Sequence, residues 1–239
     1  HLIVTVHGFS GRATDLGYVQ RRLEFEKDFV VLACTCNQGR TWDGVAAGGR
    51  RVAREVAAFT AQRPELKTIS FIGNSMGGLY SRYALAELST DLVQAAFVTT
   101  AAPHLGVGMA AYGTIAGVVP MPPARDLTGQ TDLLQDLMAP RFLDPLRVFH
   151  VRRAYAASAC DFMVPFESAL FTKSKPPLER STTTVVECGG VADDPPNALA
   201  ADLDALGWTK CVVSRADEPG GFLPREALKD LSHWRAGEA

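Results

Sequence analysis

Residues 70–78, SFIGNSMGG, place a serine between glycines at the point where a strand pattern gives way to a helical one. The residues before it favour β-structure, and the segment after it, LYSRYALAEL, has the apolar spacing of a helix. Gly73 and Gly77 leave space for a turn tight enough to hold Ser75 in a strained, exposed conformation, as in the nucleophile elbow GxSxG. The alternative is an ordinary glycine loop between a strand and a helix. The flanking patterns favour the elbow.

A serine hydroxyl becomes an effective nucleophile only when a base takes its proton and an acid orients that base. In the expected arrangement, the acid and then a histidine follow the serine along the chain, at turns after later strands. Asp161, in SACDFMVPF, follows a predicted strand and is the candidate acid. Asp144 is the weaker candidate because it precedes that strand. An ordinary turn or helix-capping aspartate is the alternative interpretation of Asp161.

The candidate base follows from the positions of the five histidines. Only His233 comes after both Asp161 and the last predicted strand, and a solvated histidine of the C-terminal tail is the alternative interpretation. His104 and His150 are the next candidates to test. His7, beside a glycine at the end of the first strand, is interpreted as a structural loop residue.

A tetrahedral intermediate needs hydrogen-bond donors for its oxyanion, and two backbone N–H groups usually supply them. Met76, directly after the serine, is one predicted donor. Phe9 is the other, because HGFSG (7–11) forms a flexible turn after the first strand.

Strand and helix patterns alternate along the chain, and the strands are continuous apolar runs. This order predicts an α/β fold with a mostly parallel central sheet covered by helices on both faces, in a single domain over residues 1–239. The expected strands are 2–6, 29–35, 68–72, 95–101, 147–158 and 210–215. From about 106 to 140 the alternation stops and the chain is rich in Gly, Pro, Met and Ala, so an apolar lid insertion is expected there.

Composition narrows the possible partners. With 24 Lys and Arg against 26 Asp and Glu, the formal charge of −2 gives no reason to expect nucleic-acid binding. Five cysteines without a regular spacing are interpreted as reduced, mostly buried thiols, and neither a metal nor another cofactor is predicted. No apolar run approaches the roughly 20 residues that span a bilayer. The chain begins inside a strand without an initiator Met, which suggests a trimmed domain or processed product.

Six segments resemble the serine esterases and lipases of the DUF676 family within the α/β-hydrolase superfamily. They are VTVHGFSG, TWDGVAAGGRRVAREV, FIGNSMGGLYSRYAL, TTAAPHLGV, TGQTDLLQDLM and AYAASACDFMVPFESAL. The resemblance implies hydrolysis of carboxylic esters with a lipid or acyl-lipid substrate, and it supports Ser75, Asp161, Phe9 and Met76 in the roles given above. It fades after about residue 175, so His233 is assigned by its order in the chain.

These observations predict a cofactor-independent serine hydrolase with a Ser75–His233–Asp161 triad and an acyl-enzyme intermediate. An acyltransferase or thioesterase with the same nucleophile is an alternative, and so is a catalytically inactive binding module. The expected partners are an ester or lipid substrate and, through the lid, a transient membrane or lipid surface. We expect an intracellular protein, cytoplasmic or peripheral to a membrane, and make no prediction of its oligomeric state.

Overall fold

The computed structural model describes residues 1–23, 26–107, 122–158, 163–173, 185–189 and 191–214. Its centre is a seven-stranded sheet in the order β2-β1-β3-β4-β5-β7-β6. Six strands are parallel, and β6 runs antiparallel to β7 at one edge. The strands are β1 (Leu2–Val6), β2 (Val30–Ala33), β3 (Thr68–Asn74), β4 (Val93–Thr100), β5 (Val151–Ala157), β6 (Val185–Cys188) and β7 (Thr209–Ser214). The predicted mostly parallel sheet is confirmed, and β6 is an addition that the sequence did not indicate.

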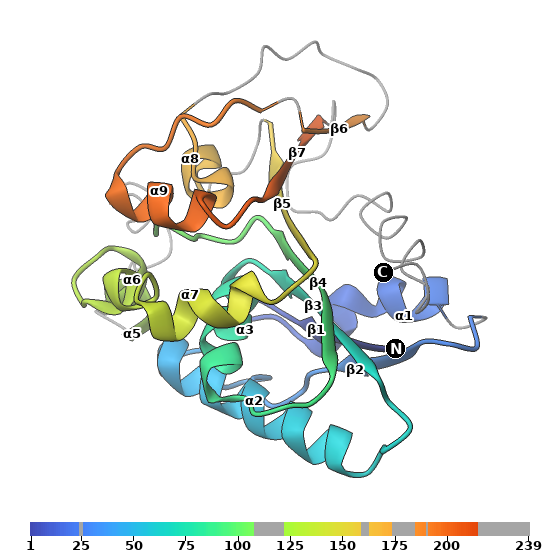
Figure 1. Cartoon of the computed structure of the whole chain (residues 1–239). Helices are drawn as coiled ribbons and strands as arrows, with labels where there is room; N and C mark the ends of the chain where they lie inside the picture. The colour runs from blue at the N-terminus through green and yellow to red at the C-terminus, as the bar shows by residue number, and fades with distance from the viewer. Residues whose placement is uncertain (24–25, 108–121, 159–162, 174–184, 190, 215–239) are drawn as a thin grey trace.

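Helices cover both faces of this sheet (Figure 1). The 3-10 turn η1 (Ala13–Leu16) and helix α1 (Gly17–Leu23) pack on one face. The opposite face carries α2 (Val45–Ala61), α3 (Met76–Glu87) and α7 (Pro140–Arg147). The shorter helices are α5 (Pro122–Leu127), α6 (Leu133–Asp136), α8 (Phe166–Leu170) and α9 (Ala198–Asp204).

The first strand shows why continuous apolar runs form the centre of this sheet. Leu2, Val4 and Val6 pack among the side chains of the α2 and α3 face, and Ile3 packs on the α1 face. Successive side chains of a strand point to opposite faces, so a strand covered on both sides must be apolar at nearly every position.

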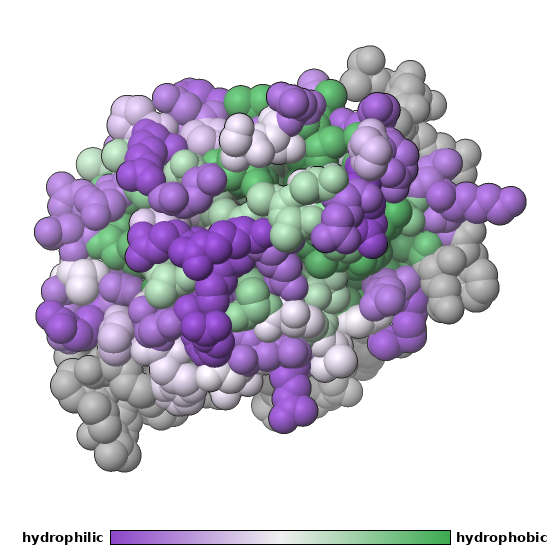
Figure 2. Space-filling model, turned by 90° about the horizontal axis from the view of Figure 1, so that it is seen from below, coloured by the Kyte–Doolittle hydropathy of each residue, from purple (hydrophilic) through white to green (hydrophobic). Residues whose placement is uncertain are grey.

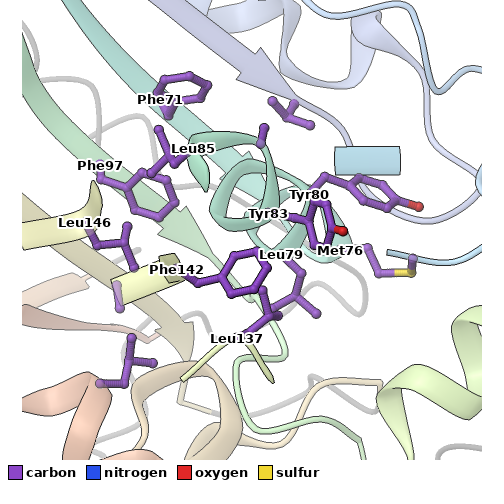
Figure 3. Close-up of a cluster of buried hydrophobic side chains, with 14 of the residues drawn as sticks. Phe71, Met76, Leu79, Tyr80, Tyr83, Leu85, Phe97, Leu137, Phe142 and Leu146 are labelled. Carbon is purple, nitrogen blue, oxygen red and sulfur yellow. The ribbon is translucent and has the colours of Figure 1, made fainter. Parts of the chain in front are cut away.

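Helices α2 and α3 lie unusually close to each other because α2 has two glycines at their contact. A Cβ atom on Gly48 would lie 2.3 Å from the ring of Tyr80, and one on Gly49 would lie 2.5 Å from the Cβ of Tyr83. Both tyrosines project from α3 (Figure 3). The two helices are therefore fixed against each other by direct backbone-to-ring packing.

The other side of α3 packs on α7 and on the sheet. The ring of Tyr83 lies 5.2 Å from that of Phe142, centroid to centroid, and the Phe97 ring lies 5.5 Å from that of Phe149. Figure 3 shows the side chains of Phe142 and Phe97 beside α3. Full burial of a large apolar side chain contributes roughly 1.5–3 kcal/mol, so α3 is held firmly on both sides.

Part of the segment expected to form a lid belongs to the core. Leu127, Leu133, Leu134 and Leu137 all lie in the main hydrophobic cluster, on α5, α6 and the turn that follows. Residues 108–121 of the same segment lie outside the described residues. A lid therefore stays a prediction, and residues 122–140 include the packed helices α5 and α6.

The expectation of reduced cysteines is wrong for one pair. Cys188 on β6 and Cys211 on β7 face each other in the antiparallel register and form a disulfide. Sequence spacing could not identify the pair because 23 residues separate them and β6 itself was not predicted. Cys34 and Cys36 are free thiols, and Cys160 lies outside the described residues.

One face of the molecule is mixed in character (Figure 2). Hydrophilic and hydrophobic residues are interspersed on the face seen in Figure 2. Within the described ranges, no helix combines the length and apolar composition needed to cross a bilayer.

Candidate active site

Ser75 occupies the single residue between the end of β3 and the start of α3. Its backbone has φ 53° and ψ −128°, a conformation that residues with a Cβ rarely adopt. Its amide donates a 2.8 Å hydrogen bond to the Thr100 carbonyl of the neighbouring strand β4, and its carbonyl accepts one of 3.0 Å from the Gly78 amide. Such strain persists only where surrounding structure holds it. The strained turn predicted from the glycine spacing is confirmed.

The glycine after Met76 permits this turn. A Cβ on Gly77 would lie 2.0 Å from the carbonyl oxygen of Val6, so the first turn of α3 runs directly against the end of β1. No side chain larger than hydrogen fits at this position without moving backbone.

The loop after β1 contacts the same turn. A Cβ on Gly8 would lie 2.8 Å from the Cβ of Ser75, which places the next residue, Phe9, beside the serine. Met76 is the first residue of α3, where backbone N–H groups have no acceptor within the helix and favour negative charge. The two predicted oxyanion donors therefore belong to segments that meet at Ser75, and their role stays a prediction.

Ser75 opens into an apolar pocket. Its lining consists of Phe9, Ser75, Met76, Pro103, Val107, Pro123, Ala124, Leu127, Met163 and Val164. Among the described residues, every lining side chain other than that of Ser75 is apolar, so this part of the pocket suits a hydrocarbon chain better than a polar group.

One wall of the pocket is tied to the start of α2. The Asp126 carboxylate on α5 accepts a 2.9 Å hydrogen bond from the Val45 amide and another of 2.9 Å from the Thr131 hydroxyl. Asp126 thereby satisfies a free N–H group at the N-terminus of α2. The wall formed by α5 is fixed relative to the helix that packs on α3.

The two predicted partners of Ser75, Asp161 and His233, lie outside the described residues. The strands that precede them are described. β5 and β7 are neighbours in the sheet and run parallel to β3, so all three end at the same edge, where Ser75 lies.

Other positions considered from the sequence lie away from this edge. Asp144 is on α7, exposed, and pairs with Arg147 at 3.4 Å. His150 is exposed directly before β5, at the opposite end of the sheet from Ser75. His1 contacts Ser70 and Thr68 near the start of β3.

The two remaining described histidines are buried. His7 forms a 2.9 Å hydrogen bond with the Gly8 carbonyl, which agrees with a structural role in the loop. His104 lies 3.0 Å from the Thr99 hydroxyl through Nε2 and 3.4 Å from the Arg82 guanidinium through Nδ1. Burial, and then the charge of Arg82, hold the pKa of His104 well below its ordinary value. None of the described histidines hydrogen-bonds to Ser75 within the described part of the chain.

Arg82 is a structural feature that sequence reasoning missed. It is fully buried on α3 and donates a 2.6 Å hydrogen bond to the Leu137 carbonyl. Burial lowers its pKa to about 9. It joins α3 to the α6–α7 turn and, through His104, to the loop that carries Pro103 and Val107 of the pocket. A signal existed in the sequence, because Arg82 interrupts the apolar face of a predicted helix.

Comparison with known proteins identifies the family. A family described as "Putative serine esterase (DUF676)" matches residues 1–124. "Putative lipase ROG1" of Saccharomyces cerevisiae is 29% identical over 198 residues, which are 71% of this chain and 28% of that protein. "Putative lipase C4A8.10" of Schizosaccharomyces pombe is 29% identical over 199 residues, 70% of this chain and 25% of that protein. The chain thus spans about a quarter of the length of these relatives.

Among solved structures, Bacillus licheniformis lipase BlEst2 in its mature form aligns with a TM-score of 0.45 and 15% identity, over 71% of this chain and 69% of that one. The family match covers more than half of the chain. The sheet order and the serine turn described above are those of an α/β hydrolase. The chain belongs to the family described as "Putative serine esterase (DUF676)" and has an α/β-hydrolase fold.

Proposed function

We propose that this chain hydrolyses carboxylic esters of lipids or other acyl compounds, with Ser75 as the nucleophile. The observation that carries the proposal is the strained, half-exposed Ser75 at the start of α3, facing a pocket whose other lining residues are apolar. Residues held in rarely populated backbone conformations cluster at active sites. The family membership supports a hydrolase.

In the proposed mechanism, the Ser75 hydroxyl attacks the ester carbonyl while His233 accepts its proton. Asp161 orients His233 and stabilises the imidazolium. The oxyanion accepts hydrogen bonds from the Phe9 and Met76 amides. His233 then protonates the departing alcohol, and water releases the acid from the acyl enzyme by the same steps in reverse.

The sheet supports the assignment of Asp161 and His233 although neither is described. Asp161 follows the end of β5 by four residues, and β7 ends before the segment that carries His233. Because parallel strands present their C-terminal ends at one edge, both segments start near Ser75.

Apolar residues at the mouth of the pocket support contact with a lipid surface. Met163 lines the pocket with 37% of its surface exposed, and Trp42, 45% exposed, packs its ring against that of Phe9. The described part of the 106–140 segment forms a wall of the same pocket. These apolar residues support the proposal that the protein makes transient contact with a lipid surface.

The disulfide bears on localisation. Disulfides persist in oxidising compartments and are rare in the cytosol, so the Cys188–Cys211 bond weighs against the cytoplasmic location expected from the sequence. We propose an oxidising compartment instead.

A fluorophosphonate probe tests the nucleophile. We expect it to label the wild type and not Ser75→Ala, because only an activated serine attacks the phosphorus centre. Ser89→Ala, an exposed serine beyond the other end of α3, is the control and should label normally. The measurement is intact mass before and after labelling. Absence of labelling in the wild type would support a binding module, and labelling of Ser75→Ala would place the nucleophile elsewhere.

Replacement of the predicted triad partners tests the rest of the mechanism. His233→Ala and Asp161→Asn should each lower kcat by roughly 10³–10⁴-fold, since the members of a triad act as a unit. His150→Ala and Asp144→Asn are the matched controls and should retain activity. Normal kcat in His233→Ala would show that the base lies at another position.

Esters that differ only in acyl length test the apolar pocket. We expect kcat/KM to rise roughly fourfold per added methylene until the chain fills the pocket, because burying each methylene contributes about 0.8 kcal/mol. Ala124→Phe should remove this gain for longer chains and spare short ones. A flat profile in the wild type would exclude the pocket as the acyl site. An added alcohol acceptor distinguishes hydrolysis from acyl transfer by the products.

A further inference from the structure

The loop after β1 (residues 7–11), which carries the predicted oxyanion donor Phe9, contacts the segment between β2 and α2. Thr41 in this segment is 1% exposed, and its hydroxyl accepts a 3.0 Å hydrogen bond from the Ser10 amide. The next residue, Trp42, meets the ring of Phe9 edge-on, with the ring centres 4.5 Å apart. Phe9 is therefore held at two points: its ring packs against Trp42, and the amide of the next residue, Ser10, is hydrogen-bonded to Thr41.

Ser10 needs such a constraint. Its φ of 55° lies in the left-handed region, which residues other than glycine rarely adopt. A loop released from Thr41 would relax away from this conformation, and the Phe9 amide would turn with it.

One side chain of α2, that of Arg51, forms hydrogen bonds with the segment that carries Thr41. The Arg51 side chain is only 11% exposed. It donates hydrogen bonds of 2.7 Å to the Asn37 side chain and of 2.7 Å to the Arg40 carbonyl. Its two terminal nitrogens also contact both carboxylate oxygens of Asp43, at 2.5 and 2.7 Å. These three partners lie on either side of Thr41 in the chain.

The charges of this cluster are matched. The bond to Arg51 is the largest cause that lowers the pKa of Asp43, so the carboxylate stays ionised beside the guanidinium. Asn37, 1% exposed, also donates a 3.3 Å hydrogen bond to the Gly48 carbonyl of α2. The planar guanidinium carries five donors in a fixed fork, so it can hold three separate groups at once.

The same helix also fixes the other predicted donor. Gly48 and Gly49 of α2 pack directly on Tyr80 and Tyr83 of α3, whose first residue is Met76. One helix thus contacts both halves of the site: α3 through the glycines, and the Phe9 loop through Arg51 and Thr41.

We propose that Arg51 is a positioning residue for the oxyanion hole. It holds residues 37–43, and through Thr41 it sets the Phe9 amide at the correct separation from the Met76 amide. This inference rests on the proposed esterase function. Arg51 is not among the residues that line the pocket. We therefore expect it to affect the stability of the transition state, through the loop, rather than the affinity for substrate.

Arg51→Met and Thr41→Val test this role, with Arg54→Met as the matched control. Arg54 is exposed on the same helix, three residues further along. Loss of an oxyanion donor lowers kcat by about 10²–10³-fold, so a displaced donor should cost roughly tenfold to a hundredfold. KM for a short soluble ester should stay within about twofold, since ground-state binding is unchanged. Arg54→Met should match the wild type.

A second readout separates positioning from general destabilisation. A boronic acid forms a tetrahedral adduct with the serine, and an uncharged amide of the same side chain mimics the bound substrate. In Arg51→Met and Thr41→Val, affinity for the boronic acid should fall by the same factor as kcat, and affinity for the amide should not change. Arg51→Lys, which keeps the charge without the fork, should restore kcat only in part.

The outcomes distinguish this inference from the function on which it rests. A wild type without esterase activity or probe labelling would refute the proposed function. An active wild type in which Arg51→Met and Thr41→Val both behave like Arg54→Met would refute the positioning role alone. Thermal unfolding of each variant identifies loss of the fold. Should Arg51→Met fail to fold, Thr41→Val decides, because it removes a single hydrogen-bond acceptor with little change of shape.

Discussion

The geometry of the site depends on the close approach between the first turn of α3 and the end of β1. A Cβ on Gly77 would lie only 2.0 Å from the Val6 carbonyl oxygen, and a single residue separates β3 from α3. That residue is Ser75, and its backbone is forced to a positive φ. Gly8 also lies against the serine, so the proposed nucleophile, the N-terminus of α3 and the neighbouring loop meet at one tightly packed point.

Around this contact, α2 acts as a rigid support. It packs on α3 through Gly48 and Gly49, and its first amide binds Asp126 on the pocket wall. Arg51 on its surface holds the segment beside the Phe9 loop. Catalysis in a site of this kind depends on preorganised groups, and their positions are set here by a helix that supplies none of the proposed reacting atoms.

Local patterns in the sequence were sufficient to predict the six parallel strands and the serine turn. Continuous apolar runs predict buried parallel strands, and paired glycines beside Ser75 predict a close backbone approach. Contacts between distant residues could not be predicted in this way: Arg82 and Leu137 are 55 residues apart, and Val45 and Asp126 are 81 apart. Composition also gave no indication that residues 122–140 contain helices with leucines packed in the core. The short edge strand β6 and its disulfide have no local signal.

The rate at which a fluorophosphonate labels Ser75 in Gly77→Ala is the most direct test of the steric constraint. The methyl group must displace backbone at the serine, so we expect labelling to slow by at least about a hundredfold. Gly17→Ala, on α1 at an ordinary helical φ of −61° with only the end of the Arg21 side chain nearby, should label at the wild-type rate. Unchanged labelling in a folded Gly77→Ala protein would contradict the account.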